Sequence, residues 1–139
     1  MEKICVIGVG YVGLVSGAGL SEFGHDVTCV DIDEVKINQL NDGKIPIYEP
    51  GLQSLVESNY RNNNRFHFSI DISKSIKDSS VVFIAVGTPQ KNNGKVDLSF
   101  IDSAANIIAD NINNYKIICT KSTVPVGTGK RIEKIILSK

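Results

Sequence analysis

Short apolar runs alternate with amphipathic stretches along the whole chain. Runs rich in Val, Ile and Phe have the length of β-strands at residues 3–7, 26–30, 66–70, 81–86 and 116–120. Apolar residues recur at helical spacing in residues 12–23, 34–40, 51–60, 72–77, 98–112 and 130–137. This alternation predicts a parallel sheet with helices on both faces and right-handed connections between its strands.

Individual segments refine this picture. The run at 81–86 (VVFIAV) is apolar at every position, which is typical of a strand covered on both faces. The helix predicted at 98–112 has apolar residues three and four apart, and Asp97 precedes it as a candidate N-cap. The polar stretch RNNNR at 61–65 is expected to form a turn.

The first apolar run leads directly into GVGYVG at residues 8–13, which has the spacing GxGxxG. Glycine weakens strands and helices, so three glycines at this spacing need a reason. Between a strand and a helix, Gly8 permits a sharp turn, Gly10 lets a pyrophosphate approach the backbone, and Gly13 lets the helix pack against the strand. The amides at the helix start, near Tyr11, would then face the phosphates, so the motif predicts a dinucleotide site.

An acidic residue follows these glycines at the distance typical of a ribose ligand. Asp31 lies 18 residues after Gly13, at the end of the run 26–30. A carboxylate there accepts hydrogen bonds from the adenosine ribose and repels a 2′-phosphate, which favours NAD over NADP. Lys36, on the next helix, either reaches the same ribose edge or lies on a solvated helix face.

Two further loops follow predicted strands, at the sheet edge where ligands bind in this architecture. One contains Thr88 before a proline, and the other is STVPVGT at residues 122–128, which contains Thr123. The two threonines either face the cofactor or substrate, or serve as ordinary turn and helix-cap residues.

Composition argues against several classes of partner. The 139 residues suffice for one globular domain, with 42% hydrophobic and 22% charged residues. Fifteen basic and 15 acidic residues give a net charge of zero, so we expect neither nucleic acid nor a membrane surface as a partner. No apolar run could span a bilayer and the start lacks a signal-peptide pattern, so we expect a cytoplasmic protein.

The three cysteines, Cys5, Cys29 and Cys119, lie far apart inside apolar runs. Their odd number and wide spacing offer no disulfide framework and no paired metal ligands. We therefore expect three buried small hydrophobic residues and no metal site. His25 and His67 are expected to take part in neither catalysis nor metal binding.

Together these patterns predict an α/β fold of the Rossmann type, a doubly wound parallel sheet in three αβα layers. We expect a single domain over residues 1–139 with the strand order 3-2-1-4-5. The cofactor crevice should lie where that order reverses, between the strands at 3–7 and 81–86.

Five motifs resemble those of the nucleotide-sugar dehydrogenases, the UDP-glucose/GDP-mannose dehydrogenase family. They are GVGYVGL at 8–14, VDID at 30–33, PIYEPGL at 46–52, VGTP at 86–89 and KSTVPVGT at 121–128. They occur in order over nearly the whole chain, and the last is more similar to the UDP-glucose enzymes than to the GDP-mannose enzymes.

This resemblance implies NAD as cofactor and two successive oxidations of UDP-glucose at C6, which give UDP-glucuronate through a cysteine thioester. By motif it assigns cofactor binding to Gly8, Gly10, Tyr11, Val12, Gly13, Asp31, Lys36, Thr88 and Thr123. Val12 would donate its backbone amide, and Thr123 would also help to order a water near the reacting carbon. The resemblance further implies a homodimer for the intact protein.

One family motif is missing from the chain. The family's nucleophilic cysteine lies well downstream, in a glycine-rich segment followed by proline and lysine, and no such segment occurs here. We therefore expect the NAD-binding domain alone, without the central helix and the C-terminal UDP-binding domain, and inactive on UDP-glucose. A GDP-mannose or UDP-N-acetylmannosamine dehydrogenase and a non-catalytic NAD-binding module remain open as alternatives.

Overall fold

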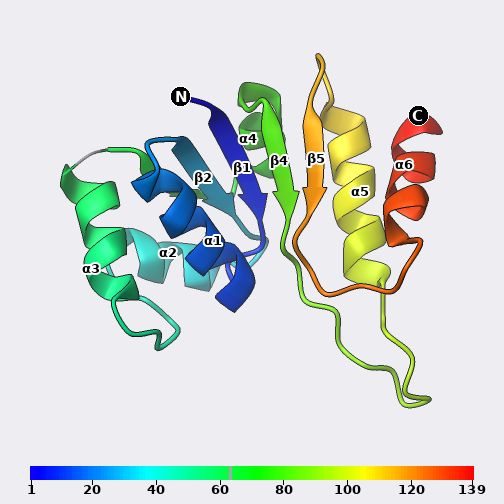
Figure 1. The fold of residues 1–139 in the computed structure, drawn as a ribbon, viewed down its shortest axis with the longest axis horizontal. Coiled ribbons are helices and arrows are strands. Elements are labelled where there is room, and N and C mark those ends of the chain that lie inside the picture. The colour runs from blue at the N-terminus through cyan, green and yellow to red at the C-terminus, as the bar shows by residue number, and fades with distance from the viewer. Residues whose placement is uncertain (63) are drawn as a thin grey trace.

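A computed structural model, which describes residues 1–62 and 64–139, confirms the predicted α/β architecture. Within these residues the strands are β1 (Lys3–Ile7), β2 (Asp26–Val30), β3 (Phe66–Ser69), β4 (Val81–Ile84) and β5 (Ile117–Thr120). All neighbouring strands pair in parallel, in the order β3-β2-β1-β4-β5 that the sequence predicts. Figure 1 shows the sheet running across the molecule with helices before and behind it.

The helices lie close to their predicted positions. They are α1 (Tyr11–Glu22), α2 (Glu34–Asn41), α3 (Leu52–Glu57), α4 (Ile72–Asp78), α5 (Ser99–Asn111) and α6 (Thr128–Leu137). A π-helical turn, η1 (Ser58–Asn62), continues α3. The turn predicted at 61–65 begins inside η1 and includes residue 63, which lies outside the described residues. No helix in the described part of the chain is both long and apolar enough to span a membrane.

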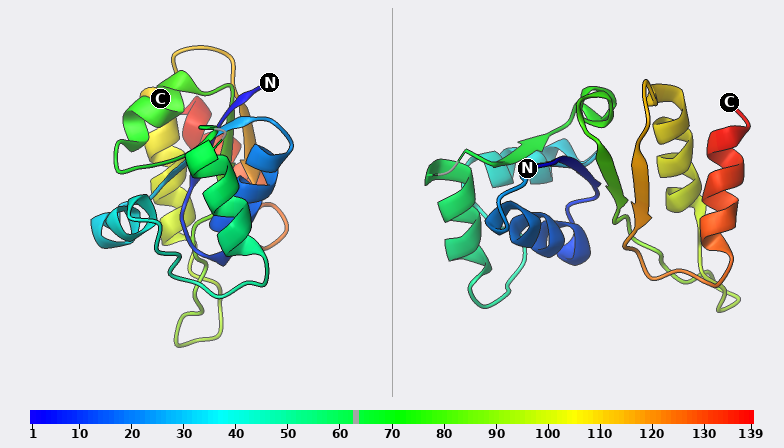
Figure 2. Two further views of the ribbon diagram at one scale, coloured as in Figure 1. Left: turned by 90° about the vertical axis from the view of Figure 1, so that its left-hand side faces the viewer. Right: turned by 45° about the horizontal axis from the view of Figure 1, so that its top comes forward.

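Each face of the sheet carries its own hydrophobic core, because successive strand residues point to opposite faces. Ile4 and Val6 of β1 belong to one core, together with side chains of α1, α2 and α3. Cys5 and Ile7 belong to the other, together with side chains of α4, α5 and α6. The views in Figure 2 show the same layered arrangement of sheet and helices.

We expected all three cysteines to be buried, but Cys119 on the edge strand β5 is not. Cys5 and Cys29 are buried, whereas Cys119 of β5 is only half-buried and Ile117 is 49% exposed. The helices of the first core, α1, α2 and α3, lie between β1 and β3 in the chain and cover the half of the sheet that is far from β5 (Figure 1). One face of β5 therefore stays accessible, while its other face joins the second core.

Candidate dinucleotide-binding site

A cleft of about 640 Å³ opens where β1 and β4 end, at the point where the strand order reverses. This is the predicted position for a cofactor crevice, and the volume is typical of small-molecule sites. The turn after β1 and the β2–α2 turn form one part of its wall, and the loops after β4 and β5 form another. The cleft brings together these predicted site residues: Gly8, Gly10, Tyr11, Val12, Asp31, Lys36, Thr88 and Thr123.

The three glycines of the turn have two roles: Gly8 and Gly13 permit close packing, and Gly10 leaves open space beside the backbone. Gly8 has φ +108°, and a Cβ there would lie 2.7 Å from the carbonyl oxygen of Ala85. A Cβ on Gly13 would overlap the carbonyl oxygen of Gly8, so Gly13 lets α1 pack on the turn and does not itself line the cleft. Beside Gly10, by contrast, a Cβ would meet no described heavy atom within 4 Å. Space for a ligand therefore exists at the middle glycine.

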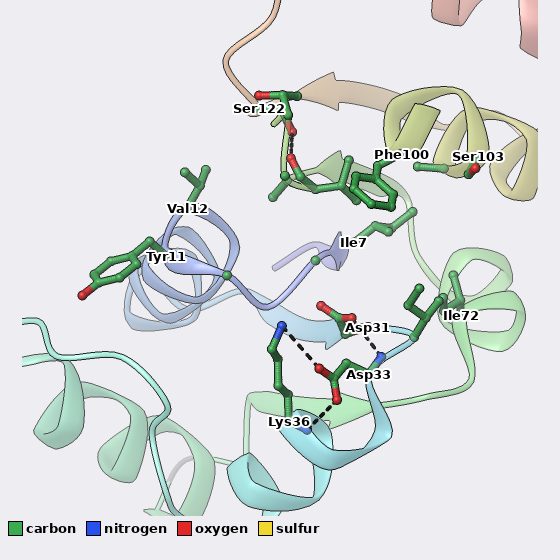
Figure 3. A pocket seen from close by; sticks show the side chains of 18 of the residues that line it. Ile7, Tyr11, Val12, Asp31, Asp33, Lys36, Ile72, Phe100, Ser103 and Ser122 are labelled. Atoms are coloured by element: carbon green, nitrogen blue, oxygen red, sulfur yellow. Dashed lines mark hydrogen bonds and ion pairs between the residues drawn. The ribbon is translucent and has the colours of Figure 1, made fainter. Parts of the chain in front are cut away.

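Helix α1 begins at this turn with its first amides at the cleft. Gly10 is the N-cap and offers no side-chain acceptor to them. A helix start of this kind binds anions, because its amides and its dipole both favour negative charge. The Tyr11 ring extends away from Asp31 and Asp33 (Figure 3), and its hydroxyl donates to the Tyr48 carbonyl oxygen at 3.1 Å. Any contact of Tyr11 with phosphate would thus come from its backbone.

Asp31 is held in place by two backbone amides. Its Oδ2 accepts a hydrogen bond from the Val9 amide at 2.9 Å, and its Oδ1 accepts one from the Asp33 amide at 3.0 Å. A carboxylate oxygen has two lone pairs, so each oxygen can still accept a hydroxyl proton. The carboxylate is therefore oriented at the end of β2 with acceptor capacity left for a ribose.

Lys36 lines the cleft, and it is paired with Asp33, which the sequence motifs did not single out. Its Nζ lies 3.4 Å from Oδ2 of Asp33. Asp33 is also the N-cap of α2, since its Oδ1 accepts a hydrogen bond from the Lys36 amide at 3.2 Å. That amide, and then the Lys36 ammonium, lowers the pKa of the Asp33 carboxyl below its usual value. The signal was present in the sequence as an aspartate three residues before a lysine at a helix start.

The loops after β4 and β5 are joined by side-chain hydrogen bonds. The Thr88 hydroxyl donates to the Thr123 carbonyl oxygen at 2.9 Å. The Ser122 hydroxyl, which is buried, donates to the Val86 carbonyl oxygen at 2.7 Å. These bonds fix the end of the cleft that lies across from Lys36 in Figure 3.

An apolar wall of α5 completes the cleft and was not predicted. Phe100, Ala104 and Ile107 line it, and Ala104 belongs at the same time to the core that contains Ile101 and Ile108. Their spacing of four and three residues is itself helical, so an apolar face that widens beside the core positions was the available signal. Figure 3 shows Phe100 and Ser103 projecting from α5 along one side of the cleft.

None of the cysteines lines this cleft. Burial raises the pKa of Cys5 to about 12 and also raises that of Cys29. Both thiols are therefore protonated near neutral pH, and neither has the activating, accessible surroundings that a thiolate nucleophile needs.

A parallel sheet in this order, with a glycine turn and a carboxylate at the end of β2, defines a Rossmann-type dinucleotide-binding domain. The chain belongs to the UDP-glucose/GDP-mannose dehydrogenase family, because the model of that family's NAD-binding domain matches residues 2–139. The cofactor of this domain is accordingly NAD, as the sequence predicts.

Individual relatives cover nearly all of the chain. The UDP-glucose 6-dehydrogenase TuaD of Bacillus subtilis is 52% identical over 136 residues, which are 98% of this chain and 29% of that protein. The UDP-glucose 6-dehydrogenase of Rhizobium meliloti is 53% identical over 135 residues, 96% of this chain and 31% of that protein. A crystal structure of a GDP-mannose dehydrogenase from Pseudomonas aeruginosa superposes with a TM-score of 0.93 at 38% identity, covering 98% of this chain and 32% of that one. The chain thus spans a little under a third of each relative.

Proposed function

We propose that this domain serves an enzyme that oxidises UDP-glucose to UDP-glucuronate in two NAD-dependent steps. The observation that carries the proposal is identity above 50% to two UDP-glucose 6-dehydrogenases over almost the whole chain. The geometry of the cleft supports it, because every element that a dinucleotide needs converges there.

The residues of the cleft fit NAD. Open space beside Gly10 and the free amides at the start of α1 suit the pyrophosphate. Asp31 offers two oriented oxygens to the adenosine ribose, and Lys36 lies close to the same edge. Phe100 and its neighbours on α5 provide an apolar surface for a flat base. When bound, NAD supplies the chemistry by accepting a hydride from C6 of the sugar.

Thr123 and Thr88 belong to the other end of this site. Thr123 is exposed at the cleft, and we assign its hydroxyl the auxiliary role of orienting a water near the reacting carbon. Thr88 lines the cofactor site and uses its own hydroxyl to fix the Thr123 backbone at 2.9 Å. The loop that positions the water is therefore held by the loop that lines the cofactor.

Residues 1–139 form the NAD-binding domain in this proposal, and the sugar nucleotide is bound by a further part of the intact protein. That part would also bring the cysteine nucleophile, since none of the three cysteines lines the cleft. The homodimer implied by the sequence resemblance stays a prediction.

The intact protein is expected to form two NADH per UDP-glucose and to oxidise UDP-glucose faster than GDP-mannose or UDP-N-acetylmannosamine. Residues 1–139 alone should form none, because holding NAD does not supply a nucleophile or a uridine pocket. NADH absorbance with each sugar nucleotide measures both expectations.

Two outcomes would contradict the proposal. Steady NADH formation by residues 1–139 alone would show that the catalytic parts are misplaced. A preference of the intact protein for GDP-mannose would favour the second candidate, which the TM-score of 0.93 to a GDP-mannose dehydrogenase supports.

A further inference from the structure

A cation at the ribose end of the cleft poses a problem for cofactor selection. Lys36 lines the cleft near Asp31, and its side chain is 47% exposed. A free ammonium there would attract the 2′-phosphate of NADP, in opposition to the carboxylate of Asp31. Selection of NAD over NADP therefore needs a neighbouring negative charge that neutralises the Lys36 ammonium and holds it in place.

Asp33 lies in position to neutralise the Lys36 ammonium. Its Oδ2 lies 3.4 Å from Nζ of Lys36, and its Oδ1 accepts the Lys36 amide at 3.2 Å, so it binds both ends of that residue. The amide of Asp33 also donates to Oδ1 of Asp31 at 3.0 Å. Figure 3 shows the three side chains gathered at one end of the cleft. A continuous set of bonds thus links the ribose acceptor to the cation beside it.

We propose that Asp33 determines cofactor specificity as a positioning residue, by holding the Lys36 ammonium and cancelling its charge so that the cleft rejects NADP. The proposal rests on the assignment of the adenosine ribose to Asp31. With Asp33 in place, the three side chains carry a net charge of −1, which repels a 2′-phosphate. Without its charge the net value is zero and Lys36 is free to turn toward the phosphate.

The test compares Kd values for NAD and NADP by titration calorimetry of the intact protein. Asp33→Asn and Asp33→Ser remove the charge but keep a side chain that caps α2, because Asn and Ser are also good N-caps. Lys36→Met removes the ammonium, and the double variant Asp33→Asn with Lys36→Met completes the cycle.

Asp33→Asn and Asp33→Ser are each expected to lower the ratio of the NADP Kd to the NAD Kd by about fivefold, the upper range for an exposed ion pair. In the Lys36→Met background, Asp33→Asn should change that ratio by less than about twofold, since no ammonium is left to release. Raising the salt concentration should shrink the first effect, because these charges are exposed.

Asp110→Asn is the matched control. It removes the same charge from an exposed aspartate–lysine pair, Asp110 with Lys139 at 2.7 Å, on the last turn of α5 and outside the cleft lining. It should leave the ratio unchanged.

The ratio of the two Kd values distinguishes a change in specificity from a folding defect, since damage to α2 would weaken the binding of both cofactors together. A ratio that stays constant in both Asp33 variants while NAD still binds would overturn this proposal alone. An equal shift with and without Lys36 would also overturn it, because the charge would then act directly. Failure of the unsubstituted protein to bind NAD would instead overturn the ribose site itself.

Discussion

Gly13→Ala is expected to destabilise the domain by about 3 kcal/mol and to abolish NAD binding. The added Cβ would overlap the carbonyl oxygen of Gly8 and would lie 3.3 Å from the Cβ of Ala85. The Gly8 oxygen belongs to the backbone, so it cannot move aside as a flexible side chain could. Helix α1 would have to shift away from the turn, which would displace the amides to which we assign the phosphates of NAD.

Urea denaturation of the variant and the unsubstituted chain measures this effect. Gly19→Ala, in the same helix, is the matched control, because its Cβ would meet no described heavy atom within 4 Å. It should stabilise the domain by roughly 0.4–1 kcal/mol through helix propensity and reduced freedom of the unfolded chain. Equal midpoints for Gly13→Ala and the unsubstituted chain would show that α1 does not depend on close packing at the turn.

Asp31→Ala should weaken NAD binding by about 1.5–3 kcal/mol, the usual range for hydrogen bonds to a charged group. This corresponds to roughly a 10- to 150-fold rise in Kd. The affinity for NADP should fall less, since the variant also removes the carboxylate that repels a 2′-phosphate. Titration calorimetry with both cofactors measures the difference.

Asp26→Ala provides a control on the same strand. Asp26 lies at the amino end of β2, where its Oδ1 is 3.1 Å from Nε2 of His67, and it does not line the cleft. It should leave the affinity for NAD unchanged. Equal losses of NAD and NADP affinity in Asp31→Ala would refute the ribose role of Asp31.

The fold was predictable because each local pattern agreed with the architecture. The expected ranges for β1 and β2 match the structure, and the strand order follows from parallel strands with helical crossovers. Hydropathy could not place the end of β4, which was expected to continue to Val86. The structure ends β4 at Ile84, opposite Ile7, after which Gly8 turns β1 away; the Ala85 amide still donates to the Ile7 carbonyl oxygen at 2.8 Å, and Ala85 and Val86 line the cleft.

The glycine turn of the site was predictable, because only glycine fits where a Cβ would collide with the backbone. A Cβ on Gly8 or Gly13 would meet backbone atoms, and the GxGxxG spacing already indicates such crowding. The pairing of Lys36 with Asp33 was not predicted, although it is local: Asp33 precedes Lys36 by three residues and caps α2, and only its place beside the cleft depends on the fold. The same applies to Phe100, whose role on the wall depends on how α5 is rotated against the sheet.

NAD is expected to bind in the cleft between β1 and β4, where the strand order reverses. Titration of isotope-labelled residues 1–139 with NAD, followed through backbone amide resonances, tests both the binding and its location. Saturable shifts are expected at Gly10, Val12 and Asp31, with little change at Asp26 and His67 on the opposite edge of the sheet. Absence of saturable shifts, or shifts centred on Asp26 and His67, would contradict the account.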